Sequence, residues 1–198
     1  MPKIVDHEAR RKDFIAAAYE SILEEGLART TVRSVAKRAG YTTGALVHYF
    51  ADKSELIRQV LDENGNFVRE RMESAQLANE GRAALRQVLL EALPTDKRSA
   101  ASWRIWLALW YHSEESDAMR REERQRYKEW LGRVEDMLQQ SLQLGELPGS
   151  IEPADEARMI VALVDGMGVQ YLMSNGRLSA RQITRTVDHY LARLYASE

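Results

Sequence analysis

The chain has 198 residues, of which 44% are hydrophobic and 29% are charged, and its net charge is −2. This length can hold one or two small domains with substantial cores. The absence of cysteine excludes disulfides and thiolate metal sites, and it is typical of a reducing compartment. No N-terminal apolar run resembles a signal peptide, and no uncharged run of about 18 residues is present to span a membrane. We therefore expect a cytoplasmic protein without a membrane segment.

Helical periodicity dominates the chain, and almost no stretch alternates with a period of two residues. This pattern, together with only four prolines, predicts an all-α fold. Asn64-Gly65-Asn66 interrupts the fourth expected helix, so that helix either bends there or tolerates the glycine on an exposed face. The expected helices cover residues of about 7–25, 32–39, 43–50, 53–78, 82–93, 98–113, 115–144, 153–175 and 179–195.

Residues 31–56, TVRSVAKRAGYTTGALVHYFADKSEL, predict two short helices joined by a glycine turn. Thr31 and Thr42 can each cap a helix through a hydroxyl that accepts from a first-turn N–H. Gly40 lies where the first helix must end in a left-handed conformation. A second helix held across a first by such a turn can enter the major groove of DNA. If the turn is considered by itself, a helical hairpin without a DNA-binding role explains the pattern equally well.

The second short helix has an outward face of small residues. Leu46 and Phe50, four residues apart, share the face that should pack on the first helix of the domain. The outward residues are then Thr43, Gly44, Ala45, Val47 and His48. Gly44 lets the helix N-terminus approach phosphates, which free N–H groups attract. This face suits a surface that comes close to another backbone.

Residues 10–57 resemble the DNA-binding domain of the tetracycline-repressor (TetR) family. The family pattern has a first amphipathic helix, a glycine, A-x-x-x-G at the turn, and S/T-x-G-x-L-x-x-Y/H-F-x-x-K-x-x-L after it. Eleven residues match in register over about 45 positions: Gly26, Thr31, Ala36, Gly40, Thr42, Gly44, Leu46, Tyr49, Phe50, Lys53 and Leu56. The resemblance implies an N-terminal helix-turn-helix domain, expected over residues 1–53, and a helical ligand-binding and dimerisation domain over residues 54–198.

The resemblance also implies roles for individual residues. Phosphate contacts are expected from Thr31, Thr42, Thr43, Tyr49 and Lys53, and base-edge contacts from Arg33, Ala45 and His48. Many family members have a tyrosine where this chain has Val47, which cannot donate a hydrogen bond but can contact a thymine methyl. Because the recognition helix lacks Arg, Asn and Gln, we expect much of the specificity to come from DNA shape and half-site spacing.

Charge is distributed unevenly along the chain. Residues 1–53 carry nine Lys/Arg against seven Asp/Glu, and the remainder carries 19 against 23. Arg10, Arg11 and Lys12 begin the first helix, where they either contact phosphates or form a solvated basic turn. Phosphate contacts would make the affinity for DNA fall steeply with salt.

The segment 98–113 is the most apolar of the chain, and Trp103, Trp106 and Trp110 lie on one stripe of it. A helix that is apolar on every side is expected to be buried in a bundle. The stripe is either core packing or an aromatic pocket that holds a cation against ring faces, and the family places its effector pocket among these helices. The expected ligand-binding residues are Trp103, Trp106, Trp110, Tyr111, Tyr127, Trp130 and Asp165.

The segments SAASWRIWLALWYHS and ALVDGMGVQYLMSNG are similar to the C-terminal domain of a TetR subgroup. That subgroup includes the choline-responsive regulator of betaine synthesis (BetI-like). Its members respond to varied ligands, so the resemblance makes choline one candidate effector.

The two expected C-terminal helices carry continuous apolar faces, which the family pairs with their copies in a second subunit. The alternative is that these faces close the core of a single chain. The expected interface residues are Met159, Leu163, Gly166, Met167, Val187, Tyr190, Leu191 and Leu194. Isologous pairing would present two recognition helices to a pseudo-palindromic operator.

The sequence therefore favours a homodimeric, ligand-responsive transcriptional regulator, a repressor that a small-molecule effector releases from double-stranded DNA. The alternatives are a transcriptional activator and a helical DNA-binding or interaction protein that has no effector. An enzyme is not expected, because the four histidines are scattered and no nucleophile triad or phosphate loop is evident. No catalytic residue, metal site or cofactor is expected.

Overall fold

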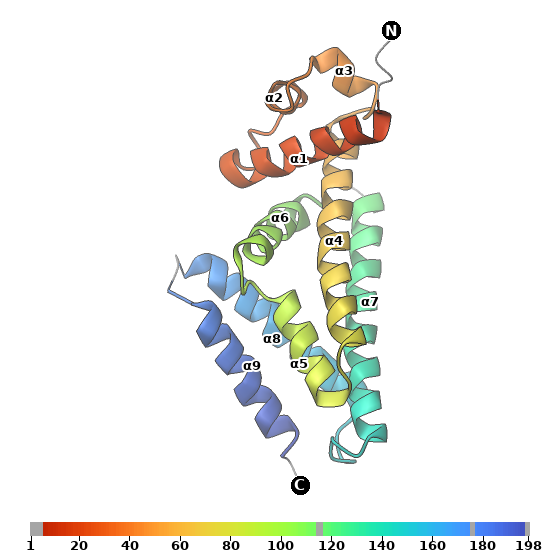
Figure 1. Ribbon diagram of the computed structural model, residues 1–198, viewed down its shortest axis with the longest axis vertical. Coiled ribbons are helices and arrows are strands. Elements are labelled where there is room, and N and C mark those ends of the chain that lie inside the picture. The colour runs from red at the N-terminus through yellow and green to blue at the C-terminus, as the bar shows by residue number, and fades with distance from the viewer. Residues whose placement is uncertain (1–5, 114–116, 175–176, 197–198) are drawn as a thin grey trace. The chain divides into compact units, whose positions relative to one another are not determined.

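The computed structural model describes residues 6–113, 117–174 and 177–196, without the side chains of 109, 111–113 and 118. Every regular element of this part of the chain is a helix, as the periodicity predicts (Figure 1). In chain order the helices are α1 (His7–Glu25), α2 (Val32–Arg38), α3 (Thr43–Val47), α4 (Lys53–Leu77), α5 (Gly81–Ala92), α6 (Lys97–Ser113), α7 (Asp117–Gln143), α8 (Pro153–Met173) and α9 (Ala180–Leu194).

Most helix boundaries fall within one or two residues of the expected ones, and α1 matches at both ends. Two differences matter. Helix α3 ends at Val47, with His48 as its C-cap, and does not continue to Phe50. Helix α4 runs without interruption through Gly65, because one glycine costs a helix interior only about 1 kcal/mol relative to alanine.

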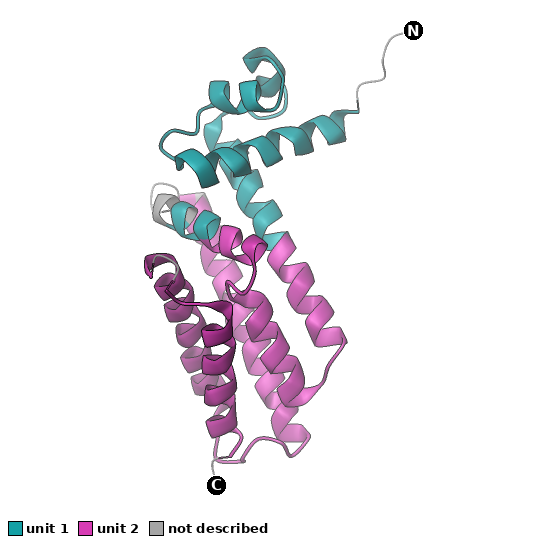
Figure 2. Ribbon diagram, turned by 60° about the vertical axis from the view of Figure 1, so that its left-hand side comes forward, with its two compact units in different colours: residues 1–66, 104–112 teal, residues 67–103, 113–198 magenta. Residues whose placement is uncertain are grey.

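The chain divides into two compact units (Figure 2). Unit 1 takes residues 1–66 and 104–112, and unit 2 takes residues 67–103 and 113–198. The division falls inside α4 and again inside α6, later than the expected boundary after residue 53, where α4 begins. Two helices therefore contribute to both units.

The core of unit 1 forms around Phe14 of α1. The ring of Phe14 meets Phe50 edge-on at a centroid distance of 6.3 Å, and it lies 5.0 Å from the ring of Tyr41. Leu46 is fully buried, so the predicted inward face of the second short helix is confirmed. Other large buried side chains of unit 1 include Ile15, Ile22, Val35, Leu56, Ile57 and Val60.

Unit 2 is built around α7, which packs against α5 and α8, while α9 packs against α5. Arg86 on α5 forms a bidentate pair with Asp188 on α9, with distances of 2.5 and 3.1 Å. The carboxylate of Glu146 accepts from the backbone N–H of Arg82 at 2.7 Å and so caps the start of α5. Buried aliphatic residues fill the interior: Leu85, Val88, Leu89, Val134, Met137, Leu138, Ile160, Val161, Val164, Ile183, Val187 and Leu191.

Trp103 is fixed in the interior of unit 2. Its indole Nε1 donates to the backbone oxygen of Ala92 at 2.8 Å, and its ring lies against the backbone of α8 at Gly168. Only 8% of Trp103 is exposed. Within the described residues, no helix is long and apolar enough to cross a membrane.

Candidate nucleic-acid interface and ligand site

The turn between α2 and α3 is built from the capping residues that the sequence indicates. Thr31 caps α2, where its hydroxyl accepts from the N–H of Ser34 at 3.0 Å and Ser34 reciprocates. Thr42 caps α3 by accepting from the N–H of Ala45 at 3.1 Å. Gly40 takes a positive φ of 79°, which a side chain would make unfavourable. Local sequence thus determines the turn that holds α3 across α2.

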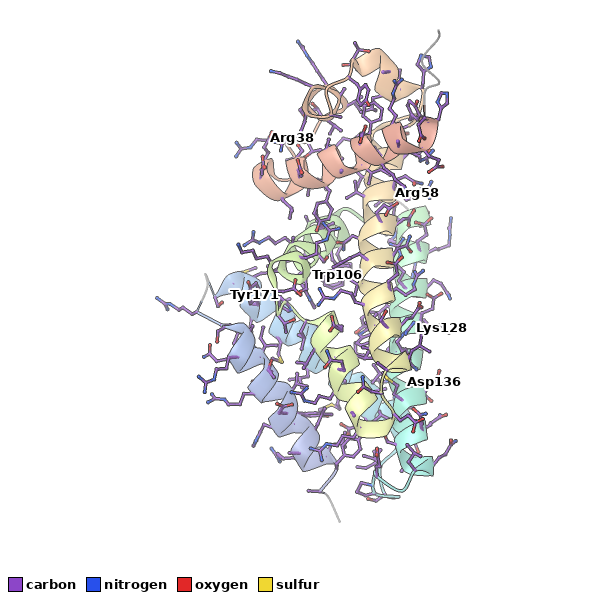
Figure 3. The ribbon with its side chains drawn as sticks, viewed as in Figure 1. Arg38, Arg58, Trp106, Lys128, Asp136 and Tyr171 are labelled. Atoms are coloured by element: carbon purple, nitrogen blue, oxygen red, sulfur yellow. The ribbon has the colours of Figure 1, made fainter. Side chains whose placement is uncertain are left out.

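An ion-pair cluster joins the end of α2 to the end of α1. Arg38, labelled in Figure 3, lies 2.7 Å from Glu24, 2.9 Å from Glu25 and 3.7 Å from Glu20. Its hydrogen bonds lower the pKa of the Glu24 carboxyl. Because these carboxylates are largely exposed, the cluster contributes to the orientation of α2 more than to stability.

The face of α2 and α3 that points away from the core carries most of the expected DNA contacts. The exposed members are Thr31, Arg33, Thr42, Thr43, Gly44, Val47 and His48. Ala45 is half-buried, and Val47 is 52% exposed. Polar caps, small residues and a histidine therefore form one accessible surface, which a hairpin that served only as a scaffold would not need.

Tyr49 and Lys53 are both half-buried at the edge of this surface. The hydroxyl of Tyr49 lies 2.8 Å from Nδ1 of His7. The ammonium of Lys53 donates to the backbone oxygen of Leu27 at 3.1 Å, which leaves two of its three N–H donors for other acceptors. These contacts anchor the edge of the accessible surface of α2 and α3 to α1 and to the loop after it.

A shallow hollow of about 220 Å³ lies between α1 and α3. It is lined by His7, Arg10, Ala45, His48 and Tyr49. Ala45, His48 and Tyr49 are among the residues predicted to contact DNA, whereas His7 is not. The available signal was two histidines and an arginine in one short domain, and only the folded chain brings the start of α1 beside α3 and the residues after it.

In unit 2, the expected ligand residues fall into two groups. Trp103 belongs to the packed interior described above, whereas Tyr127 and Trp130 on α7 retain exposed surface. The hydroxyl of Tyr127 donates to Asp165 of α8 at 3.1 Å. Burial raises the pKa of the Asp165 carboxyl, although the Tyr127 hydrogen bond opposes the shift. No arginine or lysine is found paired with Asp165 among the described residues.

Trp106 and Trp110 stack on each other in the part of α6 that belongs to unit 1. Their ring centroids are 5.4 Å apart and their planes differ by 8°. Trp110 is 53% exposed, so the prediction that this helix is buried on every side is wrong at its C-terminal end. The Trp106 ring covers only one face of the Trp110 ring, so stacking alone does not bury Trp110. The side chain of Tyr111 lies outside the described residues.

The expected interface residues divide by exposure. Four of them are buried within this single chain: Met167, Val187, Leu191 and Leu194. These side chains have almost no surface left to offer a partner, and they close the packing of α8 and α9 against the rest of unit 2. The other four, Met159, Leu163, Gly166 and Tyr190, keep accessible surface.

An accessible stripe on α8 is formed by Met159, Leu163, Gly166, Gln170 and Met173, which follow one another at spacings of four and three residues. Met159 is 63% exposed and Met173 is 72% exposed. A side chain at Gly166 would meet nothing within 4 Å, so the helix backbone is open to close approach there. Met173 is not among the interface residues expected from the sequence. It lies seven residues after Gly166, and this spacing was the available sign that both share one face of the helix.

Comparison with known proteins agrees with this architecture. Residues 14–60 match the family model of bacterial regulatory proteins of the tetR family, and residues 81–196 match that of the BetI-type transcriptional repressor C-terminal domain. The chain is 31% identical to the HTH-type transcriptional regulator BetI of Burkholderia thailandensis, over 99% of this chain and 98% of that protein. It is 27% identical to the HTH-type transcriptional regulator PksA of Bacillus subtilis, over 94% of this chain and 90% of that protein.

The fold is shared with a transcriptional regulator from Saccharomonospora viridis, whose crystal structure is a complex with choline. The TM-score is 0.90 at 17% sequence identity, and the match covers 97% of this chain and all of that one. Together with the matching models over both parts of the sequence, these findings show that the chain belongs to the TetR family of transcriptional regulators, with a C-terminal part of the BetI type.

Proposed function

We propose that this regulator is a homodimeric repressor that binds a pseudo-palindromic operator through α3 and leaves it when a small cation binds in unit 2. The observation that supports the DNA-binding part best is the accessible face of α2 and α3. This face combines two threonine caps, a glycine at the helix start and small side chains. Such a face can lie against a phosphate backbone without steric hindrance.

The dimer is proposed to form across the accessible stripe of α8. Its methionines at 159 and 173 are among the most exposed large apolar side chains of the described chain, and exposed apolar patches are typical of interaction surfaces. Gly166 between them allows two helices to approach closely. An isologous pair would carry two copies of α3 to two half-sites.

The effector is proposed to be a quaternary ammonium compound such as choline, held near Tyr127, Trp130 and Asp165. Asp165 is a half-buried carboxylate whose pKa is raised by burial. A cation bound beside it would provide the positive charge that stabilises the ionised carboxylate. Aromatic side chains on α7 can contribute ring faces to the same cation. The choline complex of the Saccharomonospora viridis protein supports this class of ligand.

Release of DNA requires that the effector bind the non-DNA-binding conformation more tightly. The coupling is reciprocal, so DNA must weaken the binding of choline by the same factor that choline weakens the binding of DNA. A coupling of about 1–3 kcal/mol, or roughly 5- to 150-fold, is typical of such systems.

The proposal is tested by selecting duplexes from a randomised library with the purified protein and then titrating choline into the enriched complex. We expect a palindromic motif and a fall in DNA affinity of at least fivefold, which is about the lower end of typical couplings. The Asp165→Asn variant serves as the control, because it should bind the same duplex but lose the response to choline.

Absence of any enriched sequence would overturn the operator proposal. Enrichment without a response to choline, tetramethylammonium or betaine aldehyde would overturn the ammonium effector and leave the DNA-binding function standing. An increase in affinity for DNA with choline would contradict a repressor that its ligand releases. It would indicate a regulator that needs the ligand to bind DNA.

A further inference from the structure

Three carboxylates lie near the C-terminal end of α1, where the preferences of a helix by itself disfavour them. Glu24 and Glu25 occupy its last turn, which carries no basic residue, and Glu20 lies one turn earlier. The partial negative charge of a helix C-terminus repels acidic side chains. Carboxylates also repel the phosphates of the DNA that proteins of this family bind. This conflict with local preference indicates that the tertiary structure uses the three carboxylates.

The tertiary partner of all three carboxylates is Arg38, the last residue of α2 (Figure 3). Its guanidinium nitrogens lie between 2.7 and 3.7 Å from the carboxylate oxygens. The other two cations of α2, Arg33 and Lys37, are exposed and form no ion pair in the part of the chain that the structure describes. Arg38 is thus the cation of α2 whose charge is used within the protein, whereas Arg33 and Lys37 remain available to a ligand.

Packing alone holds α2 weakly, because this helix has only seven residues and two buried side chains, Val35 and Ala36. Polar contacts attach it to α1 at both ends. At its start, the buried hydroxyl of Thr30 lies 3.1 Å from that of Ser21, and at its end Arg38 holds the last turn of α1. Two attachment points on one helix restrict both its tilt and its rotation, which a contact at one end could not do.

Helix α3 follows α2, because backbone hydrogen bonds close the turn between them. The N–H of Tyr41 donates to the backbone oxygen of Ala36 at 2.9 Å, and α3 itself has one buried side chain, Leu46. The hydroxyl of Tyr41 donates to Asp13 at 3.0 Å, which attaches the turn to the first half of α1, whereas Arg38 attaches α2 to its end. A change in the orientation of α2 is therefore passed to the exposed face of α3.

We propose that Arg38 is a positioning residue for DNA recognition: its ion pairs with Glu24 and Glu25 set the orientation in which α2 and α3 meet DNA, and its guanidinium does not contact DNA. The inference rests on the DNA-binding function proposed above. Base contacts need this orientation, whereas attraction to phosphates depends mainly on charge. The cluster therefore acts on the ratio of specific to non-specific affinity.

The test measures the dissociation constants of the purified protein for the duplex enriched in the selection above and for a scrambled duplex of equal length. Arg38→Gln and the double variant Glu24→Gln/Glu25→Gln should each lower the ratio of specific to non-specific affinity about three- to tenfold, the order of one or two exposed ion pairs. If only charge mattered, the loss of two carboxylates would tighten the binding of both duplexes. The specific affinity of the double variant should instead fall.

Further variants serve as controls. Glu8→Gln removes an exposed carboxylate of α1 outside the cluster and should leave the ratio unchanged. The exchange Arg38→Glu/Glu24→Arg reverses one ion pair and should recover part of the ratio that Arg38→Glu alone loses. Urea denaturation checks folding. Glu24→Gln/Glu25→Gln should be about as stable as the wild type, because removal of acidic side chains from a helix C-terminus offsets the loss of exposed ion pairs.

An unchanged or higher ratio in Glu24→Gln/Glu25→Gln would overturn the proposal. A fall confined to Arg38→Gln would show that the guanidinium contacts DNA directly, and would overturn the positioning role as well. No recovery in the exchange variant would contradict the pairing of Arg38 with Glu24. Equal ratios in all variants leave the DNA-binding function intact while this inference fails, whereas a wild type that enriches no duplex overturns both.

Discussion

Gly168 of α8 faces the indole ring of Trp103, and an added Cβ would overlap with the ring carbons. The ring cannot move freely, because its Nε1 is bonded to the Ala92 backbone. We expect Gly168→Ala to lower the free energy of unfolding by roughly 1 to 3 kcal/mol through overpacking. Urea denaturation measures it, with Gly132→Ala on α7 as the matched control, since nothing lies within 4 Å of that position. Equal stability of both variants would contradict the close packing.

Asp165 should make stability depend on pH. Burial raises the pKa of its carboxyl in the folded chain, so between the unfolded and the folded pKa the folded state binds more protons. Stability therefore falls as the pH rises through this window. We expect Asp165→Asn to be more stable than the wild type at pH 7. The difference should shrink as the pH falls and vanish below about pH 3, where the carboxyl is protonated in both the folded and the unfolded wild type.

Thermal unfolding at pH 4, 5.5 and 7 checks this expectation. The Tyr127→Phe variant serves as a comparison, because it removes the hydroxyl that donates to Asp165 and should destabilise the protein at pH 7. A destabilised Asp165→Asn at neutral pH would mean that the ionised carboxylate has a stabilising partner in addition to the Tyr127 hydroxyl.

At the scale of the element, α4 is one of the two helices that belong to both units, and Gly65 lies next to the point where α4 divides between them. A Cβ at Gly65 would meet nothing within 4 Å. We expect Gly65→Ala to raise the free energy of unfolding by about 0.5 to 1 kcal/mol, because alanine loses less backbone entropy in a helix. Chemical denaturation provides the measurement. A loss of stability would indicate that the native helix bends at this residue.

At the scale of the whole molecule, the accessible stripe of α8 should determine the oligomeric state. Met159→Arg places a charge on the stripe, and we expect sedimentation velocity to show a monomer where the wild type is a dimer, because an unpaired buried charge opposes association. Leu77→Arg on α4 is the matched control, since Leu77 is 90% exposed and off the stripe. A dimeric Met159→Arg would place the interface elsewhere, and a monomeric wild type would contradict the dimer itself.

The fold class, the helix order and the turn between α2 and α3 could be predicted from the sequence because they depend on local rules. Thr31 and Thr42 cap helices, Gly40 takes a positive φ, and Leu46 with Phe50 marks the buried face. Each of these depends on residues a few positions apart. The spacing of eleven such residues also indicated the family.

The tertiary structure alone decided which apolar side chains remain for a partner and which polar groups meet across helices. Met167 and Met159 lie on the same apolar helix, yet one is buried and the other exposed, because burial depends on how α8 packs on its neighbours. His7 and Tyr49 are 42 residues apart and form a hydrogen bond only because the fold places the start of α1 beside the residues that follow α3. Periodicity specifies the faces of a helix, whereas the three-dimensional packing of helices specifies what each face touches.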